Sequence, residues 1–243
     1  MTDIKIEIRD LYKVFGNNPE AAMKHVHAGI SKQDLLDNHG HVLGLRDINV
    51  KIKSKRIQVI MGLSGSGKST LIRHINRLIE PTEGEVIVDG DNVLAMSTEE
   101  LRDFRRHKAS MVFQRFGLLP HRTVSQNVAY GLSIQGISEG EAFERSQRWI
   151  DRVGLAGFEQ HFPAQLSGGM QQRVGLARAL ATDAEILLMD EAFSALDPLI
   201  RTDMQNILLD LQEELHKTIV FITHDLDEAL RIGDEISILR DGE

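Results

Sequence analysis

The chain has 243 residues, and its 28 Lys and Arg against 36 Asp and Glu give a formal net charge of −8 at pH 7. This surplus of acid argues against a main role in neutralising nucleic-acid phosphates. The complete lack of cysteine excludes a disulfide scaffold, a thiol nucleophile and a cysteine-bound zinc or iron–sulfur centre. Apolar runs are only a few residues long, so we expect a soluble protein that reaches a membrane only through a partner.

The first elements of the chain are a strand and a helical segment. Ile4, Ile6 and Ile8 alternate with polar residues, which predicts a half-buried strand. Apolar residues at helical spacing follow over residues 19–38, and Ser31 is placed to cap a second short helix. We interpret this segment as an insertion between two strands.

A glycine loop between a strand and a helix comes next. Residues 57–61 are an apolar strand, and Leu71 to Ile79 carry apolar side chains at helical spacing. Residues 86–88 are predicted as a strand that enters a turn, and Ser97 with Glu100 predicts a capping box at the start of a helix.

The second half of the chain alternates helices with buried strands. Residues 123–165 are mostly helical in pattern, and residues 186–189 and 219–222 are short apolar strands, each followed by a helix. Asp197 and Pro198 suit the first positions of one of these helices. Continuous apolar strands between helices predict an α/β fold with a mostly parallel sheet that is covered on both faces.

A phosphate site is predicted at residues 62–69, which match G-x-x-x-x-G-K-[ST]. Small residues let successive N–H groups converge on phosphate oxygens at a helix N-terminus. Lys68 would reach the β- and γ-phosphates, and the Ser69 hydroxyl would coordinate Mg²⁺. The residues expected to hold the phosphates are Gly62, Ser64, Gly65, Ser66, Gly67, Lys68, Ser69 and Thr70.

Two carboxylates follow the apolar strand at residues 186–189. Asp190, at the strand end, is suited to hold magnesium through water, and Glu191 is suited to polarise an attacking water. Residues 166–173 then present a second Ser-Gly-Gly loop before a helix, which is a second anion-binding helix terminus. An enzyme with one phosphate loop does not obviously need this second loop.

Together these stretches resemble the ordered motif set of ABC-type ATPases, which covers nearly the whole chain. The motifs are, in order, residues 62–69, Gln114, residues 166–171, Asp190-Glu191, residues 194–197 and His224. The resemblance implies a P-loop NTPase with a RecA-like core, an antiparallel β edge and a helical subdomain. It also implies a head-to-tail homodimer with two ATP molecules, in which Ser167 and Gly169 contact the γ-phosphate held by the partner.

The resemblance also implies the remaining site residues. Gln114 would touch magnesium and the attacking water and sense a transmembrane partner, and His224 would contact the γ-phosphate. Phe15 resembles the aromatic that stacks on adenine, with Tyr12 as the nearby rival. The implied nucleotide contacts further include Gly168, Gln171 and Asp197; the catalytic set is Glu191, His224, Gln114 and Lys68; and the Mg²⁺ ligands are Ser69, Gln114 and Asp190.

A more specific resemblance is to the ATPase subunits of glycine betaine/proline importers. It rests on residues 62–81, 189–201 and 221–233 and on the inserted segment. Such subunits often carry CBS regulatory modules after the ATPase domain, and a strand at 236–239 followed by half a turn predicts that the natural protein continues past Glu243. The alternatives are an importer of another small solute, such as an amino acid, or a non-transport ABC protein.

The expected organisation is therefore one ABC ATPase domain over residues 1–243. Its core would comprise residues 1–113 and 166–243, and its helical subdomain residues 114–165, which would receive a short helix of a permease. We expect a peripheral protein at the cytoplasmic face of the membrane, bound to that permease, linked through it to a substrate-binding protein and not bound to nucleic acid. In such importers the solute does not touch this subunit, so the sequence does not reveal which solute is transported.

Overall fold

Nine strands form two sheets in the computed structural model, which describes residues 3–114 and 116–243. The first sheet is antiparallel and has the order β2-β1-β4-β5. Its strands are β1 (Ile4–Phe15), β2 (Val42–Lys53), β4 (Glu83–Val88) and β5 (Asp91–Asn92). The second sheet is parallel, with the order β6-β7-β8-β3-β9. Its strands are β3 (Ile57–Met61), β6 (Ala109–Val112), β7 (Ile186–Asp190), β8 (Thr218–Thr223) and β9 (Glu235–Ile238).

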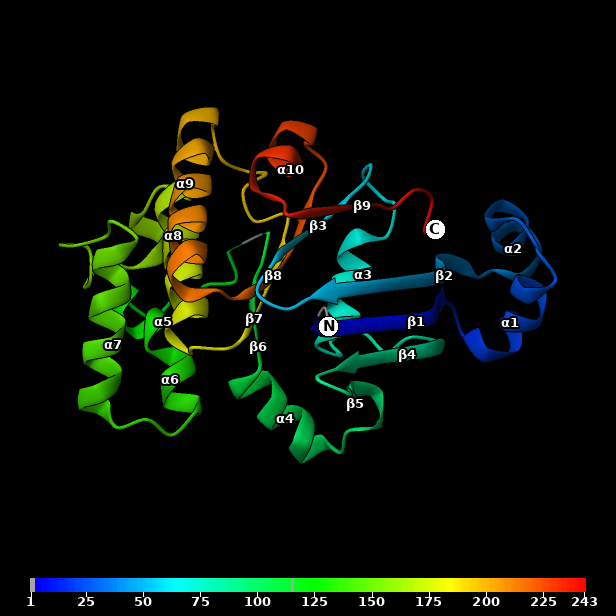
Figure 1. Cartoon of the computed structure of the whole chain (residues 1–243), viewed down its shortest axis with the longest axis horizontal. Helices are drawn as coiled ribbons and strands as arrows, with labels where there is room; N and C mark the ends of the chain where they lie inside the picture. The colour runs from blue at the N-terminus through cyan, green and yellow to red at the C-terminus, as the bar shows by residue number, and fades with distance from the viewer. Residues whose placement is uncertain (1–2, 115) are drawn as a thin grey trace.

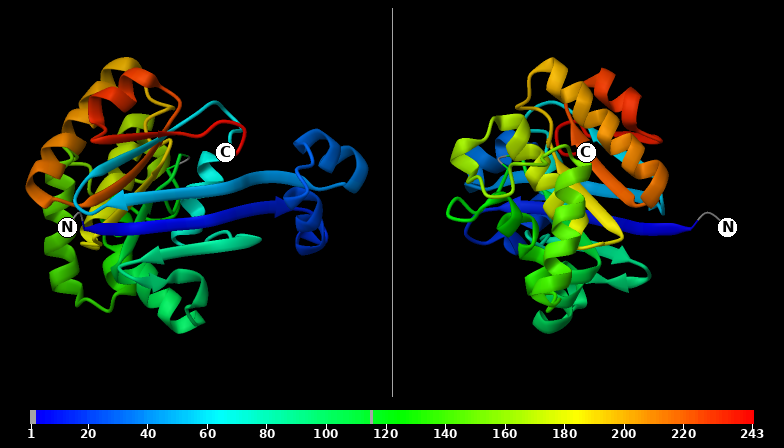
Figure 2. Two further views of the ribbon diagram at one scale, coloured as in Figure 1. Left: turned by 45° about the vertical axis from the view of Figure 1, so that its right-hand side comes forward. Right: turned by 90° about the vertical axis from the view of Figure 1, so that its left-hand side faces the viewer.

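Helices cover the sheets and extend beyond them (Figure 1). The blue insertion lies at one end of the molecule, and the green helical region over residues 124–152 lies at the other end (Figure 2). The helices are α1 (Pro19–His27), α2 (Lys32–His39), α3 (Lys68–Ile75), α4 (Thr98–His107), α5 (Val124–Val128), α6 (Tyr130–Ile134), α7 (Glu139–Arg152), α8 (Gly168–Ala181), α9 (Pro198–Leu215) and α10 (Leu226–Ile232), with 3₁₀ turns at Val93–Ala95 and Pro163–Gln165.

The central strands of the parallel sheet are buried on both faces, as their apolar sequences predict. Every residue of β7 and β8 is buried. One apolar core fills the space between the two sheets around α3, and a second packs α8, α9 and α10 against the opposite face of the parallel sheet. The predicted α/β fold with a parallel sheet covered on both faces is therefore confirmed. The antiparallel strands, however, form a sheet of their own rather than an edge of the parallel one.

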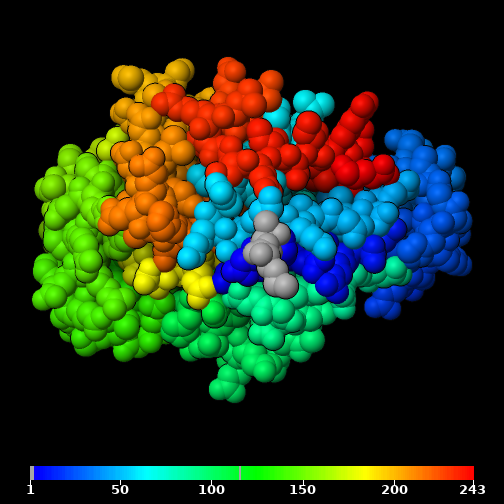
Figure 3. Space-filling view, in the orientation of Figure 1, coloured from blue at the N-terminus to red at the C-terminus, as the bar shows by residue number. Residues whose placement is uncertain are grey.

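Two smaller cores hold the helical parts in place. Val124, Leu132, Ile150 and Val174 belong to a cluster that joins α5, α6 and α7 to α8. The inserted helices α1 and α2 pack through a separate cluster onto β1 and β2. Figure 3 shows the insertion as a compact blue cap on the end of the antiparallel sheet. The insertion is thus a fixed part of the fold.

Local capping signals were good predictors, but one helix was predicted too long. Ser31, Ser97 and Asp197 each cap a helix as expected. The helix predicted to reach Ile79 instead ends at Ile75. Arg77 adopts a positive φ of 51°, and the amides of Leu78 and Ile79 both bond back to the carbonyl of Arg73. This closing turn resembles the C-terminal motifs that end helices, and the apolar side chains beyond it give no sign of it.

No helix within residues 3–114 and 116–243 combines the length and the apolar character that a membrane crossing requires.

A buried histidine on α3 makes the stability of the fold dependent on pH. His74 is fully buried, and its Nδ1–H donates to the carbonyl of Ile79 at 2.7 Å. Burial lowers the pKa of His74 from 6.5 to about 4. Between these pH values the unfolded chain binds a proton that the folded chain excludes, so stability falls as pH falls through this range.

We predict that this histidine removes about 3 kcal/mol of stability between pH 6.5 and pH 4. Urea unfolding of His74→Gln should therefore show a shallower decline over this range than the wild type. His121→Gln, which changes an exposed histidine, is the matched control and should keep the wild-type slope. Equal slopes for all three proteins would contradict the assignment.

Candidate functional site

The predicted phosphate loop connects β3 to α3 and lies at the carboxyl edge of the parallel sheet. Its backbone takes positive φ at Gly65 (80°) and Gly67 (100°), which glycine adopts without strain. A side chain at Gly62 would place its Cβ 2.2 Å from the carbonyl oxygen of Leu239, so this position also requires glycine. The loop is thereby held in one tight conformation at the N-terminus of α3.

Lys68 is almost completely buried inside this loop. Its Nζ donates to the carbonyl oxygens of Gly62 and Leu63, both at 2.9 Å, and lies 3.3 Å from Glu191 Oε1. Within the described chain, the buried Ser66 hydroxyl has no hydrogen-bond partner. A buried ammonium, an unpaired hydroxyl and a helix N-terminus are the groups that bind a phosphate chain.

Glu191 is the point on which the predicted catalytic side chains converge. Gln114 Nε2 donates to its Oε2 at 3.1 Å, and His224 Nδ1 lies 3.7 Å from the same oxygen. Glu191 itself has a positive φ of 46°, and its carbonyl accepts bonds from both the amide and the hydroxyl of Ser194. This turn directs the carboxylate away from the strand and toward Lys68.

Asp190 is completely buried beside the phosphate loop. Its Oδ1 accepts from the Ser69 hydroxyl at 2.6 Å, and its Oδ2 accepts from Arg73 at 2.9 Å. A carboxylate and a hydroxyl side by side are hard oxygen ligands, which Mg²⁺ prefers. Ser69 and Asp190 therefore fit a magnesium ion at this point. Arg73, which the sequence analysis did not single out, neutralises the buried Asp190 carboxylate.

A cavity of about 630 Å³ extends from the phosphate loop to the inserted segment. Phe15 and Gln114 line it together with Ser64, Gly65, Gly67, Lys68, Ser69, Thr70 and Glu191. Its volume falls within the usual range for small-molecule sites. The structure thus brings together most of the residues predicted to bind one nucleotide.

Phe15 lines this cavity, whereas Tyr12 does not. Phe15 is the last residue of β1 and is paired with Val42 of β2, so the insertion returns the chain to the neighbouring position. Although Gly62 lies 47 positions after Phe15, Phe15 and the phosphate loop therefore line the same cavity. Gly44 leaves room for the ring, since a Cβ there would lie 2.8 Å from the ring of Phe15. Tyr12 instead packs edge-on against His27.

The second glycine loop is not part of this cavity. None of Ser167, Gly168, Gly169 and Gln171 lines it in the described chain. Ser167 caps α8, and Asp197 caps α9; both residues are exposed. A Cβ at Gly169 would lie 2.6 Å from Ile200, so close packing alone requires glycine there. His224 reaches Glu191 from outside the cavity lining.

Sequence reasoning missed the contribution of the insertion. Lys32, Gln33 and Leu36 of α2 line the cavity, as does Asp241 beyond β9. Burial lowers the pKa of Lys32, against the opposing effect of Asp241 and Glu243. No motif marks these positions. Only a helical spacing of Lys32, Gln33 and Leu36 on one face of α2 could have drawn attention to them.

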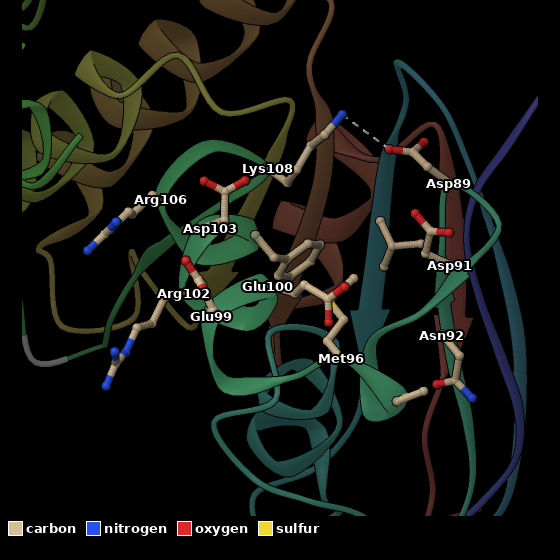
Figure 4. A pocket seen from close by; sticks show the side chains of 13 residues that line it. Asp89, Asp91, Asn92, Met96, Glu99, Glu100, Arg102, Asp103, Arg106 and Lys108 are labelled. Carbon is tan, nitrogen blue, oxygen red and sulfur yellow. Dashed lines mark ion pairs between the residues drawn. The ribbon is translucent and has the colours of Figure 1, made fainter. Parts of the chain in front are cut away.

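A larger hollow, of about 1160 Å³, lies between the β4–β5 turn and α4 (Figure 4). Five carboxylates line it, and they belong to Asp89, Asp91, Glu99, Glu100 and Asp103. Lys108 lies 3.8 Å from Asp89, while Arg102 and Arg106 extend away from the turn (Figure 4). A polyphosphate would be repelled by this concentration of negative charge. The hollow is therefore unsuited to a nucleotide despite its size.

Comparison with known proteins agrees with this geometry. The sequence pattern of the ABC transporter family matches residues 45–194. The chain belongs to this family. It is 54% identical over 240 residues to the ATP-binding protein of the glycine betaine/proline betaine transport system of Escherichia coli (strain K12), covering 99% of the chain and 60% of that relative. It thus spans about three fifths of the length of this relative.

Solved structures of this family have the same fold. A dimeric bacterial ABC transporter cassette superimposes with a TM-score of 0.83 at 35% identity, over 98% of this chain and 95% of that one. A dimeric post-hydrolysis state of the same cassette, bound to ADP and Pi, has a TM-score of 0.82 at 35% identity, with the same coverage of both chains. The resemblance drawn from the ordered motifs is confirmed at the level of the family. The more specific resemblance agrees with the similarity to the glycine betaine/proline betaine transport protein.

We predict that Lys68→Ala lowers the affinity for ATP by at least about tenfold, because a charge-assisted contact to the phosphates is lost. Titration calorimetry measures the affinity directly. Lys24→Ala, which removes an exposed lysine of α1, should bind as the wild type does. An unchanged affinity in a folded Lys68→Ala protein would contradict the assigned phosphate site.

Proposed function

We propose that the chain is the ATP-hydrolysing part of an importer for glycine betaine or a related osmoprotectant. The observation that carries the ATPase assignment is the convergence of Lys68, Gln114 and His224 on Glu191 beside the phosphate loop. The substrate class rests on the similarity to the glycine betaine/proline betaine transport protein over nearly the whole chain.

Each side chain at the site has its own task in ATP hydrolysis. Lys68 and the loop amides bind the β- and γ-phosphates of ATP. The Glu191 carboxylate accepts a proton from the attacking water, and its orientation is fixed by Gln114 on one side and His224 on the other. Phe15 supplies an aromatic face for adenine.

Magnesium is the expected companion of ATP at this site. The Ser69 hydroxyl, the Asp190 carboxylate and the Gln114 amide would hold it, and the pair Ser69–Asp190 already lies together. When bound, the ion neutralises charge that builds up on the phosphates. Arg73 keeps the Asp190 carboxylate in place, because the two are ion-paired at 2.9 Å.

The second glycine loop points to a head-to-tail dimer. Ser167, Gly169 and Asp197 lie outside the cavity of their own chain, which leaves them available to a nucleotide held by a second copy. Leu63 of the phosphate loop and Leu199 beside Asp197 are 80% and 72% exposed. Apolar side chains this exposed are what an interface would cover. ATP binding would close this dimer, and hydrolysis would reopen it.

The helical region offers a place for a permease. A groove of about 280 Å³ runs between α5, α6 and α7, and Tyr130, Ile137, Ala142 and Phe143 are among its lining residues. Phe143 is 57% exposed. An apolar groove of this kind suits a short helix of a membrane partner. Gln114 lies at the start of this helical region, so the same stretch of chain contributes to both the nucleotide cavity and the groove. Such a partner places the protein at the cytoplasmic face of the membrane and links it to a substrate-binding protein.

We further propose that residues 1–243 form one ABC ATPase domain. Its core would comprise residues 1–113 and 166–243, with residues 114–165 as the helical subdomain.

We predict that Glu191→Gln abolishes ATP turnover but keeps ATP binding, so that ATP holds the protein as a stable dimer. Loss of a general base typically reduces the rate by about 10²- to 10⁴-fold. Size-exclusion chromatography with ATP and Mg²⁺ should show the dimer. Glu213→Gln, an exposed residue of α9, is the control and should hydrolyse ATP normally. A Glu191→Gln protein that remains monomeric with saturating ATP would count against the dimer.

The transport function is tested by uptake of labelled glycine betaine into vesicles that contain the protein with its co-purified permease. We expect uptake only when ATP is present inside the vesicles, and none with Glu191→Gln. ATP-dependent uptake of a different small solute, such as an amino acid, would instead identify the protein as part of an importer for that solute. Failure to recover a membrane partner, together with salt-dependent nucleic-acid binding, would favour a non-transport ABC protein.

A further inference from the structure

The inserted helix α2 forms a wall of the nucleotide cavity. Lys32, Gln33 and Leu36 face the same space as Phe15 and the phosphate loop. The helix cannot easily move away, because fully buried Leu35 anchors it in the cluster that joins the insertion to β1 and β2. In addition, Arg46 of β2 donates to the carbonyl of Ile30, just before α2, at 2.5 Å.

The cavity contains an apolar region that would suit a purine ring. Phe15, Leu36 and Val42 all line it, and they are 40%, 45% and 50% exposed. Phe15 and Val42 are neighbours across β1 and β2. A planar base would cover these side chains and gain their hydrophobic contact. This contact would not distinguish adenine from guanine.

Gln33 adds a polar group with a fixed direction. Its Nε2 donates to both Oδ1 and Oδ2 of Asp37, one turn further along α2, at 2.9 Å each. The reversed amide would place Oε1 against the Asp37 carboxylate, where two acceptors repel each other. Across residues 3–114 and 116–243, no donor reaches Oε1. Within these residues, Oε1 therefore remains as an acceptor that Gln33 can offer to a ligand.

We propose that Gln33 selects adenine over guanine in this cavity. Its Oε1 accepts a hydrogen bond from the amino group on C6 of adenine, whereas guanine carries a carbonyl oxygen at the same position. Two acceptors would then face each other, and neither would have a donor. Leu36 contributes apolar contact to either base. The inference rests on the proposed function, since it requires a purine nucleotide in the cavity.

The test compares the dissociation constants of non-hydrolysable ATP and GTP analogues, with Mg²⁺, by titration calorimetry on the intact chain. The wild type should prefer the ATP analogue. Gln33→Leu should reduce the ratio of the GTP to the ATP constant by about tenfold, because the acceptor is lost. Leu36→Ala should weaken both analogues equally and leave the ratio unchanged. Asn38→Leu removes an exposed amide of α2 outside the cavity, and it should match the wild type.

Asp37→Asn provides a second variant that leaves Gln33 in place. It removes the carboxylate that orients the amide, so the ratio should again fall. A Gln33→Leu ratio within twofold of the wild type, or a wild type without preference, would overturn the inference while leaving the nucleotide site intact. A wild type that binds neither analogue would overturn the proposed function itself, and the inference with it.

Discussion

Parallel pairing of β3, β8 and β7 is the constraint on which the whole site depends. Met61 is in register with Thr223, and Asp190 with Ile222, so the three strands end at one edge of the sheet. The residues that follow are the phosphate loop, His224 and Glu191. Parallel strands have their carboxyl ends at the same edge of the sheet. Segments more than a hundred residues apart in the sequence therefore meet at this edge.

The cost of this arrangement is charge that must be buried. Asp190 is fully enclosed and Lys68 nearly so. Both are satisfied by close partners: Asp190 by Ser69 and Arg73, and Lys68 by two loop carbonyls and Glu191. A buried charge without such partners would be strongly destabilising. The same contacts hold the side chains where a triphosphate and its metal would need them. These contacts therefore serve both the stability of the fold and the proposed function.

The insertion shows how an addition to a fold can reach its active site. The antiparallel sheet extends β1 and β2 as a long pair, and the inserted helices close its far end. Phe15 and α2 thereby line the same cavity as the phosphate loop. The cavity is thus lined by segments of both sheets and of the insertion, and the part that we propose for the base belongs to a stretch of chain without a recognisable motif.

The sequence by itself determined the fold class, the phosphate loop, the two carboxylates after β7 and the starts of several helices, because each depends on local spacing or on apolar periodicity. It could not decide that α3 ends at Ile75, since a closing turn depends on backbone conformation at Arg77. It left Phe15 and Tyr12 as rivals, and it gave no sign of Gln33, Leu36 or Arg73. Those choices depend on which side chains face one cavity, and only the packing of the insertion and of the two sheets decides that.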